Sequence, residues 1–340
     1  MTRVGIVGAG AIARLHSAQW KKLPVTLAAV YDRNPERAAA FAAEHGGADC
    51  GSLDELLAQV DVVDICTHTD GHRAAVLAAA AARVPILCEK PFGRRLQECE
   101  EMIEACEATG TPLFVAHVVR FFPQYARAKE LIDSGAIGKP GVIRTMRAGS
   151  YPRSGSEFSS AFYRDFTRSG GVILDLGIHD IDFQCWCAGE VERVFARGLT
   201  FQGIPETDHA LLTLRFSSGA LGHIDCSWAL PPGQFRTHLE IAGDAGLLEW
   251  DSFQPPPLIW TKPNPLDPSQ SIERGANPLA PHDDPYYRQL AHFLECLEQG
   301  KPFLVTPQEA YRAVKVALAC IESVRSGQPV ELAGFREEVA

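Results

Sequence analysis

The chain has 340 residues, of which 46% are hydrophobic and 22% charged, an ordinary composition for a globular protein. This length exceeds one ordinary core, so we expect roughly two domains. The formal net charge of −10 argues against a nucleic-acid partner, which would call for a basic surface, and favours small-molecule chemistry.

The first residues run directly into a strand pattern, and no run of about 18 apolar residues occurs anywhere in the sequence. These features predict a cytoplasmic protein without a membrane contact. The ten cysteines are scattered through apolar segments and lack the Cys-x-x-Cys spacing of zinc or redox sites. We therefore expect all ten to be reduced and most of them to be buried.

A glycine-rich turn, residues 8–13, follows the short apolar run 4–7 and precedes a helical pattern. Gly8 permits a tight turn, Gly10 lets a diphosphate approach the backbone, and the small Ala13 allows the helix to pack closely on the strand. The pattern of strand, glycine turn and helix predicts dinucleotide binding. The residues expected at the diphosphate are Gly8, Gly10, Ala11 and Ile12.

Asp32 closes a second apolar run, residues 26–31, and stands nineteen residues after Ala13. At this distance an acid is placed to accept hydrogen bonds from the adenine ribose of NAD and to repel the 2′-phosphate of NADP. Arg33 beside it is able to tolerate that phosphate. We therefore expect NAD as the cofactor, with NADP possible.

Strands and helices alternate through the rest of the first half, with strands at 60–67, 85–88 and 112–116 and helices at 53–57, 73–83 and 97–108. Ligands of open parallel sheets lie beyond the carboxyl ends of the strands, so we expect Thr67 and His72 at the cofactor. A helix start without a ligand is an equal alternative for His72.

Glu89-Lys90-Pro91 ends the strand 85–88, and we expect both Glu89 and Lys90 at the cofactor. A lysine held over a nicotinamide and shielded from water can have a lowered pKa and share a proton with a substrate hydroxyl. The alternative is an exposed lysine before a turn.

The segment 169–183 places ionisable groups at helical spacing beside an apolar stripe, which consists of Leu174, Ile178, Ile181 and Cys185. On an α-helix Asp175 and His179 would lie one turn apart. A carboxylate beside an imidazole orients the ring and raises its basicity, as proton transfer near neutral pH requires. The alternative is an ordinary surface pair.

Taken together, the glycine turn, Asp32, Glu89-Lys90-Pro91, Arg120-Phe121 and Gly170-Gly171 with Asp175 and His179 resemble the glucose-fructose oxidoreductase, inositol dehydrogenase and MocA (Gfo/Idh/MocA) family. The match spans most of the chain. The resemblance implies an NAD(P)-dependent oxidoreductase acting on sugars, cyclic polyols or related carbonyl compounds. It also implies that Lys90, Asp175 and His179 form the catalytic group.

Two segments depart from the family's pattern. His117-Val118-Val119 replaces an asparagine-containing segment, and Phe162-Tyr163-Arg164 stands where the family often has Trp-Arg. These positions lie near the nicotinamide or the substrate in the family. The resemblance therefore places His117 and Arg164 at the cofactor, and Arg120 and Tyr163 at the substrate together with Asp175 and His179.

From Gly141 onward the pattern changes to strands, at 142–146, 194–199, 209–216, 221–229, 238–242 and 247–250, with one long helix among them. We expect a Rossmann domain with a doubly wound parallel sheet over residues 1–120. Residues 121–340 are expected to form an α+β domain with a large, mostly antiparallel open sheet. An apolar sheet face is expected to pair subunits into a dimer or tetramer, as is common in the family; its residues are Leu212, Leu214, Phe216, Leu239 and Ile241.

Residues 255–257, three prolines, and the polar run 262–284 predict a long surface loop. Tyr286 or Tyr287, just after it, is a candidate substrate contact, with Tyr286 preferred and simple packing as the alternative. Helices are expected at 289–299 and 308–323, the second started by Thr306-Pro307.

The leading hypothesis is an NAD(P)-linked dehydrogenase or reductase of a sugar or polyol. A non-catalytic NAD(P)-binding sensor of the same fold is the alternative, which retention of lysine, aspartate and histidine together disfavours. A metal hydrolase built on His179, Asp175 and Asp182 has little support, because no second histidine stands at ligand spacing.

Overall fold

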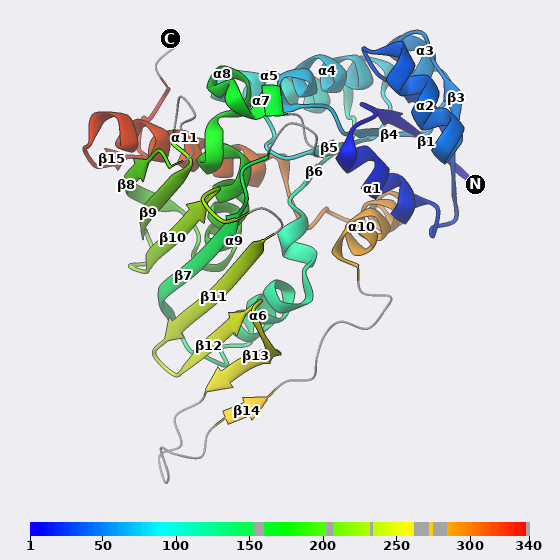
Figure 1. Cartoon of the computed structure of the whole chain (residues 1–340). Helices are drawn as coiled ribbons and strands as arrows, with labels where there is room; N and C mark the ends of the chain where they lie inside the picture. Colours follow the sequence, from blue (N-terminus) through cyan, green and yellow to red (C-terminus); the bar gives the residue numbers. More distant parts are fainter. Residues whose placement is uncertain (153–159, 202–206, 232–233, 262–271, 275–283, 338–340) are drawn as a thin grey trace. The chain divides into compact units, whose positions relative to one another are not determined.

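The computed structural model describes the chain except for residues 153–159, 202–206, 232–233, 262–271, 275–283 and 338–340 (Figure 1). The chain forms two compact units. The first unit contains Met1–Val118, residues 160–169 and Pro285–Val314, and we call it the nucleotide unit. The second unit contains the other described residues, and we call it the sheet unit.

A six-stranded parallel sheet forms the centre of the nucleotide unit, with the strand order β3-β2-β1-β4-β5-β6. This is the strand order of doubly wound nucleotide-binding folds, so the predicted Rossmann architecture is confirmed. The strands are β1 (Thr2–Val7), β2 (Val25–Tyr31), β3 (Ala48–Asp49), β4 (Val62–Ile65), β5 (Ile86–Glu89) and β6 (Leu113–Ala116).

Two of the helices in the first 118 residues begin at side-chain caps. Asn34 accepts hydrogen bonds from the first N–H groups of the second helix, which has proline in its first position, and Ser52 caps the third helix. The helices are α1 (Ala11–Trp20), α2 (Pro35–His45), α3 (Leu53–Leu57), α4 (His72–Ala82) and α5 (Leu96–Thr109), with a 3₁₀ turn, η1 (Thr69–Gly71), before α4.

Two later segments return to the nucleotide unit. They contain the short helices α7 (Ser160–Arg164) and α8 (Phe166–Ser169), helix α10 (Pro285–Gln299) and the first part of α11 (Pro307–Ser326). Leu290 and Phe293 of α10 are buried, and the Phe293 ring lies 6.0 Å from that of Phe114 on β6. We expected a single domain boundary at residue 120, and the structure differs because these later segments pack onto the nucleotide unit. Contacts between residues far apart in the sequence determine this packing.

A nine-stranded sheet forms the sheet unit, in the order β14-β13-β12-β11-β7-β10-β9-β8-β15. Among the described strands of this sheet only β7 and β10 pair in parallel, so the predicted mostly antiparallel sheet is confirmed. The strands are β7 (Pro140–Gly149), β8 (Val191–Leu199), β9 (His209–Phe216), β10 (Leu221–Ser227), β11 (Phe235–Gly243), β12 (Gly246–Asp251), β13 (Gln254–Thr261), β14 (Ile272–Arg274) and β15 (Val330–Glu331).

Helices cover one face of this sheet. The 3₁₀ turn η2 (Val118–Phe121) leads into α6 (Pro123–Asp133), and α9 (Ile178–Ala188) follows a π-helical turn, η3 (Ile173–Gly177). Tyr125 and Phe183 from these helices pack with Leu239, Ile241 and their neighbours in one buried cluster. The stripe of Leu174, Ile178, Ile181 and Cys185 is buried as the spacing predicts.

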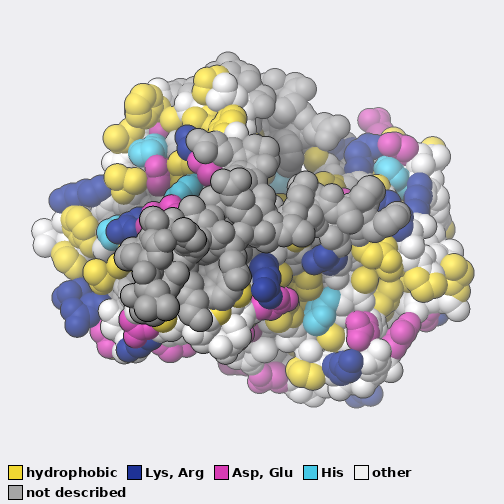
Figure 2. Space-filling view, turned by 90° about the horizontal axis from the view of Figure 1, so that it is seen from below, with side chains coloured by type: hydrophobic (Ala, Val, Ile, Leu, Met, Phe, Trp, Pro, Cys, Tyr) yellow, Lys and Arg dark blue, Asp and Glu magenta, His cyan; other side chains and the backbone are white. Residues whose placement is uncertain are grey.

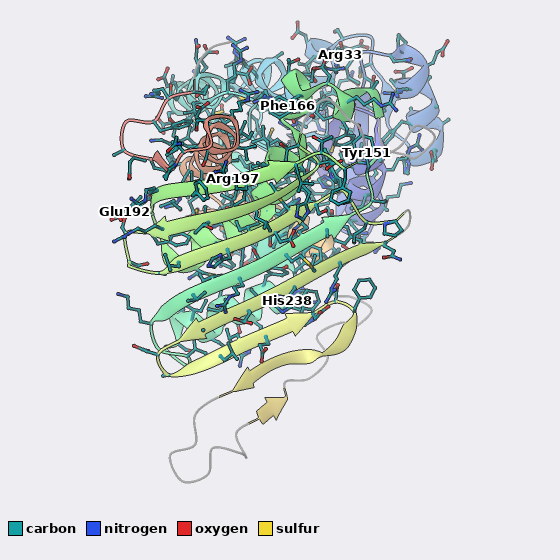
Figure 3. All side chains as sticks on the ribbon, turned by 60° about the vertical axis from the view of Figure 1, so that its left-hand side comes forward. Arg33, Tyr151, Phe166, Glu192, Arg197 and His238 are labelled. Carbon is teal, nitrogen blue, oxygen red and sulfur yellow. The ribbon has the colours of Figure 1, made fainter. Side chains whose placement is uncertain are left out.

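The apolar face that we expected to pair subunits is the wrong face. Its five residues, Leu212, Leu214, Phe216, Leu239 and Ile241, are each at most 1% exposed within the single chain, because this face packs on the unit's own helices. The opposite face, where His238 lies on β11 (Figure 3), carries exposed leucines. Those on its strands include Leu211 of β9 and Leu221 of β10, which are 54% and 43% exposed.

Two local expectations are also corrected. Asp175 lies in the π-helical turn, so the segment 173–179 is not the regular α-helix that four-residue spacing predicted. The three prolines at 255–257 belong to β13 and not to a loop. They lie where the register between β12 and β13 shifts, an irregularity that tolerates residues without an N–H. Most of the predicted polar loop, residues 262–271 and 275–283, lies outside the described residues.

The other expectations about the surface and the cysteines can be compared with the described structure. All ten cysteines are free, and nine of them are buried. On the face seen in Figure 2, acidic and basic side chains are intermixed over the described residues. Within the described part of the chain, none of the helices has the length and hydropathy that crossing a bilayer needs.

Candidate functional site

The candidate residues of the nucleotide unit gather at the carboxyl edge of its parallel sheet. Gly8 follows β1, Thr67 lies just beyond β4, Lys90 follows β5 and His117 follows β6. These four strands are consecutive neighbours in the sheet and run in the same direction. The structure therefore brings four sequence-predicted residues to the edge where ligands of this fold bind.

The glycine turn has the geometry that an anion needs. Gly8 has φ +94°, and a Cβ there would lie 2.9 Å from backbone atoms of Cys66 and Thr67, so only glycine fits. A Cβ at Gly10 would meet no atom within 4 Å among the described residues. Gly10 is also the N-cap of α1 and provides no side-chain cap, which leaves the first N–H groups of the helix for a ligand. The turn therefore fits the diphosphate of a dinucleotide.

Asp32 is held beside this turn by backbone hydrogen bonds. Its Oδ2 accepts the N–H of Ala9 at 2.8 Å, and its Oδ1 accepts the N–H of Asn34 at 2.8 Å. A carboxylate has about four lone-pair sites, so this one retains capacity for ribose hydroxyls. The neighbouring Arg33 side chain is exposed.

Lys90 is half-buried and lies in a braced turn. The Lys90–Pro91 peptide bond is cis, and the Lys90 N–H donates to Oε2 of Glu89 at 3.0 Å. His72 is fully buried, with Nδ1 3.0 Å from the carbonyl oxygen of Pro91 and Nε2 3.1 Å from that of Thr67. Both ring nitrogens thus face backbone carbonyls, and burial lowers the pKa of His72. This geometry favours the alternative for His72, a helix-start residue without a ligand, whose ring contacts the backbone of the Lys90 turn.

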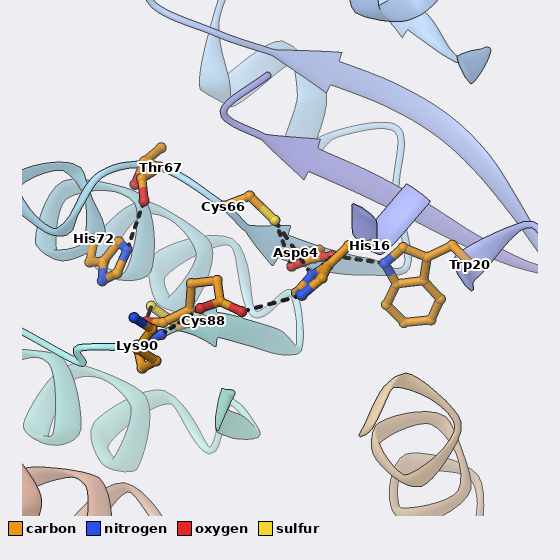
Figure 4. Close-up of polar contacts among 9 residues, drawn as sticks. His16, Trp20, Asp64, Cys66, Thr67, His72, Cys88 and Lys90 are labelled. Atoms are coloured by element: carbon orange, nitrogen blue, oxygen red, sulfur yellow. Dashed lines mark hydrogen bonds and ion pairs between the residues drawn. The ribbon is translucent and has the colours of Figure 1, made fainter. Parts of the chain in front are cut away.

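Sequence reasoning missed a buried polar cluster behind this edge. Nδ1 of His16 lies 2.9 Å from Oδ2 of Asp64, which also accepts the indole N–H of Trp20 at 2.7 Å (Figure 4). The Cys66 thiol donates to Oδ1 of Asp64 at 3.2 Å. Nε2 of His16 lies 3.2 Å from Oε1 of Glu89. The sequence feature that could have revealed this cluster is Asp64, an acidic residue inside the otherwise apolar strand β4.

The sheet unit carries the other two predicted catalytic residues. Asp175 lies in the π-helical turn and His179 in the first turn of α9, and both are half-buried. Single π-helical turns inside helices occur frequently at functional sites, because they shift side chains out of α-helical register. The structure thus leaves both residues accessible while the apolar stripe beside them is buried.

Arg120, a predicted substrate contact, is held inside the sheet unit. Its guanidinium donates to both carboxylate oxygens of Asp182, at 2.9 and 2.7 Å, and lies 5.1 Å from the centre of the Trp186 ring. Asp180 forms a similar buried pair with Arg147 at 2.7 Å. These contacts give Arg120 a structural role, and its substrate contact stays a prediction.

Three remaining predicted residues belong to the nucleotide unit. Tyr163 and Arg164 end helix α7, whose Phe162 stacks on His68 with ring centroids 4.2 Å apart. The Tyr286 ring at the start of α10 lies 5.8 Å from the His16 ring. Tyr286 therefore has a packing contact in this unit, and its substrate role stays a prediction.

Comparison with known proteins agrees with this geometry. Residues 2–117 match the model of an oxidoreductase family with an NAD-binding Rossmann fold, and residues 125–249 match the model of the GFO/IDH/MocA C-terminal domain. The first match contains the glycine turn, Asp32 and Lys90, and the second contains Asp175 and His179. The two matches together cover most of the chain.

Individual relatives match over nearly the full length. The chain is 30% identical to myo-inositol 2-dehydrogenase of Thermotoga maritima, over 97% of this chain and 98% of that protein. It is 30% identical to scyllo-inositol 2-dehydrogenase (NAD(+)) of Bacillus subtilis, over 80% of this chain and 78% of that protein. The crystal structure of a probable dehydrogenase from Thermotoga maritima, 28% identical, matches with a TM-score of 0.82 over 98% of this chain and 99% of that chain. The chain therefore belongs to the Gfo/Idh/MocA family of NAD-binding oxidoreductases.

Proposed function

We propose that the protein is an NAD-dependent dehydrogenase that transfers a hydride between the nicotinamide and a carbon bearing a hydroxyl group in a sugar, an inositol or a related polyol. The placement of Lys90 carries this proposal. It follows β5, whose neighbour β4 lies beside β1 and its glycine turn, so an ammonium group stands at the edge where the turn would hold a dinucleotide. The names of the relatives, two inositol 2-dehydrogenases, support the substrate class.

NAD, when bound, supplies a nicotinamide ring that accepts or returns a hydride. Gly8, Gly10, Ala11 and Ile12 would hold its diphosphate, and Asp32 its adenine ribose. Thr67, Glu89, His117 and Arg164 are the further residues that we propose for cofactor binding. Acceptance of NADP would depend on Arg33.

In the proposed mechanism three side chains act on one substrate oxygen. His179 takes the hydroxyl proton during oxidation and returns it during reduction, and Asp175 orients the imidazole. Lys90 donates a hydrogen bond to the same oxygen and stabilises the negative charge that develops there. The proposal thus requires Lys90 of the nucleotide unit and Asp175 and His179 of the sheet unit to reach the same substrate.

The substitution Lys90→Met tests this assignment. It removes the ammonium group and keeps the apolar stem, so we expect turnover to fall by about two orders of magnitude or more while NADH binding is retained. The measurements are NADH absorbance with a panel of inositols, sugars and sugar acids, and NADH binding by fluorescence titration. Lys21→Met, at an exposed lysine just after α1, is the matched control and should leave both unchanged.

Two outcomes would contradict the proposal. Undiminished turnover in Lys90→Met would remove Lys90 from the mechanism. NADH binding without turnover of any compound in the panel would favour the non-catalytic sensor.

We further propose that the protein forms a homo-oligomer through the open face of the sheet, where Leu211 and Leu221 are exposed. Ten free cysteines support a reducing compartment such as the cytoplasm.

A further inference from the structure

His16 lies between two carboxylates in the interior of the nucleotide unit. It belongs to α1, the helix that follows the glycine turn, while Asp64 belongs to β4 and Glu89 to β5. The exposed fractions of His16, Asp64 and Glu89 are 0%, 0% and 5%. Three elements of the cofactor-binding framework, α1, β4 and β5, therefore meet at one buried imidazole.

The two carboxylates depend on His16 to different degrees. Asp64 accepts hydrogen bonds from His16, Trp20 and Cys66, so it keeps two donors when the imidazole is removed. Oε1 of Glu89 and Nε2 of His16 face each other at 3.2 Å, and neither atom has a hydrogen-bond partner of good geometry among the described residues. Of the two acids, Glu89 is thus the one whose buried oxygen relies on the imidazole.

A charged imidazole fits this environment. Burial alone would lower the pKa of His16, but the charge of Asp64 and the hydrogen bond to it raise that pKa well above its ordinary value. A buried carboxylate without a cationic partner is costly, so a proton on His16 stabilises both acids.

His16, Asp64 and Cys66 also have the composition of a metal site, since their ligand atoms lie within 4.8 Å of one another. Metal binding would need the Cys66 thiolate and would displace the hydrogen-bond donors that contact Asp64. The thiol and the Trp20 indole both point donors at Asp64. The arrangement is therefore that of a proton network.

The network continues to Lys90 through Glu89. Oε1 of Glu89 faces His16, and Oε2 accepts the backbone N–H of Lys90 at 3.0 Å. A shift of the Glu89 carboxylate would therefore move the turn that carries the Lys90 side chain.

We propose that His16 is a positioning residue, which holds the Glu89 carboxylate and, through it, the Lys90 turn against the helix that begins at the cofactor diphosphate. This inference rests on the proposed function, because it concerns how Lys90 is aimed. The chain of contacts runs from α1 through His16 and Glu89 to the peptide group of Lys90.

Two substitutions at residue 16 separate the two arms of the imidazole, which are the contact of Nδ1 with Asp64 and the contact of Nε2 with Glu89. An asparagine amide reaches about as far as Nδ1, and a glutamine amide about as far as Nε2. His16→Asn thus keeps the Asp64 arm and loses the Glu89 arm, whereas His16→Gln keeps a donor for Glu89. We expect His16→Asn to lower kcat on the order of tenfold or more, with the Kd for NADH unchanged. His16→Gln should stay within about threefold of the wild type in kcat, although both variants melt at lower temperature.

Glu89→Gln tests the same link from the other side and serves if His16→Asn fails to fold. It should lower kcat as His16→Asn does, and the double variant should be no slower than the slower single one, because both act through one contact. Equal kcat per folded enzyme in wild type, His16→Asn and Glu89→Gln would overturn the inference. Losses that multiply in the double variant would do so as well.

The outcomes also distinguish this inference from the proposed function. If Lys90→Met abolishes turnover while the His16 and Glu89 variants keep it, only the positioning role fails. If Lys90→Met keeps turnover, the proposed function fails first. Elemental analysis completes the test: stoichiometric zinc in the wild type that disappears in His16→Asn would make the cluster a metal centre and overturn the proton network.

Discussion

At the scale of single residues, the buried charges determine how the protein responds to pH. His16 is enclosed by the titratable groups of Asp64, Cys66 and Glu89, and by the ring of Tyr286. Its pKa is raised in the folded state above the value of about 6.5 of an unfolded histidine. The proton on His16 therefore binds more tightly in the folded protein than in the unfolded chain.

This shift predicts a pH-dependent stability. A raised pKa in the folded state contributes stability that is complete below the unfolded pKa and is lost as the pH rises through the folded pKa. We expect the difference in free energy of unfolding between the wild type and His16→Gln to be largest near about pH 6 and to shrink at alkaline pH. Urea unfolding of both proteins over this range measures it. If the difference in free energy of unfolding between the two proteins instead grew with pH, His16 would be neutral in the folded protein.

The residues expected to contact a ligand were easier to predict from the sequence than the residues that hold those contact residues in position. Gly8 and Asp32 have strict local requirements, a positive φ and a position after a strand, which leave a pattern in the sequence. His16 and Asp64 are 48 positions apart, and only the sheet brings them together. A helical pattern shows that residue 16 is on a helix but not which strand residue it meets.

At the scale of the elements, helix α9 is fixed by buried ion pairs. Arg120 precedes α6 and holds Asp182 of α9 with two hydrogen bonds, both side chains being almost fully buried. Removing one partner of such a pair leaves a charge buried without compensation, which is strongly destabilising. The position of α9 matters to the proposed mechanism because His179 lies in its first turn.

We expect Asp182→Asn to lower the free energy of unfolding by about 3–5 kcal/mol. The matched control is Asp133→Asn, which removes the exposed pair between Lys129 and Asp133 on α6 and should cost about 0.5 kcal/mol or less. Chemical denaturation measures both. Similar costs at the two positions would mean that Arg120 finds another partner when Asp182 loses its charge.

The elements differ in how far the sequence determined them. Helix α11 begins at Pro307 as predicted, because the Thr306 hydroxyl accepts the N–H of Glu309 and the Glu309 carboxylate accepts the N–H of Thr306. The π-helical turn at Ile173–Gly177 was not predicted. Its apolar spacing is that of an α-helix, and packing around the turn leaves no mark in a four-residue pattern.

At the scale of the whole molecule, the open face of the nine-stranded sheet is the candidate for self-association. Leu211 of β9 is 54% exposed on this face. A carboxylate placed there would be buried in both copies of a twofold interface on this face, and a buried carboxylate without a cationic partner is unfavourable. We therefore expect Leu211→Glu to be monomeric at micromolar concentration while the wild type is a dimer or tetramer. Sedimentation velocity measures this, with Ala43→Glu on exposed α2 as the control.

A monomeric wild type would contradict the proposed assembly at once. An assembly that persists in Leu211→Glu would place the contact on another surface. The sequence predicted an apolar sheet face, but it assigned the face to the wrong side, because both sets of alternate residues in β9 include leucines and only the helices decide which set is covered.

The nucleotide unit is completed by a segment that leaves the ribosome late. Helix α10 packs on α1, and its Phe293 lies against Phe114 of β6. The first 118 residues therefore emerge with apolar surface that no earlier part of the chain covers, and this surface stays open to chaperones until α10 has been made. A message that ends before residue 285 would encode a polypeptide without α10, whose Rossmann sheet keeps that side exposed.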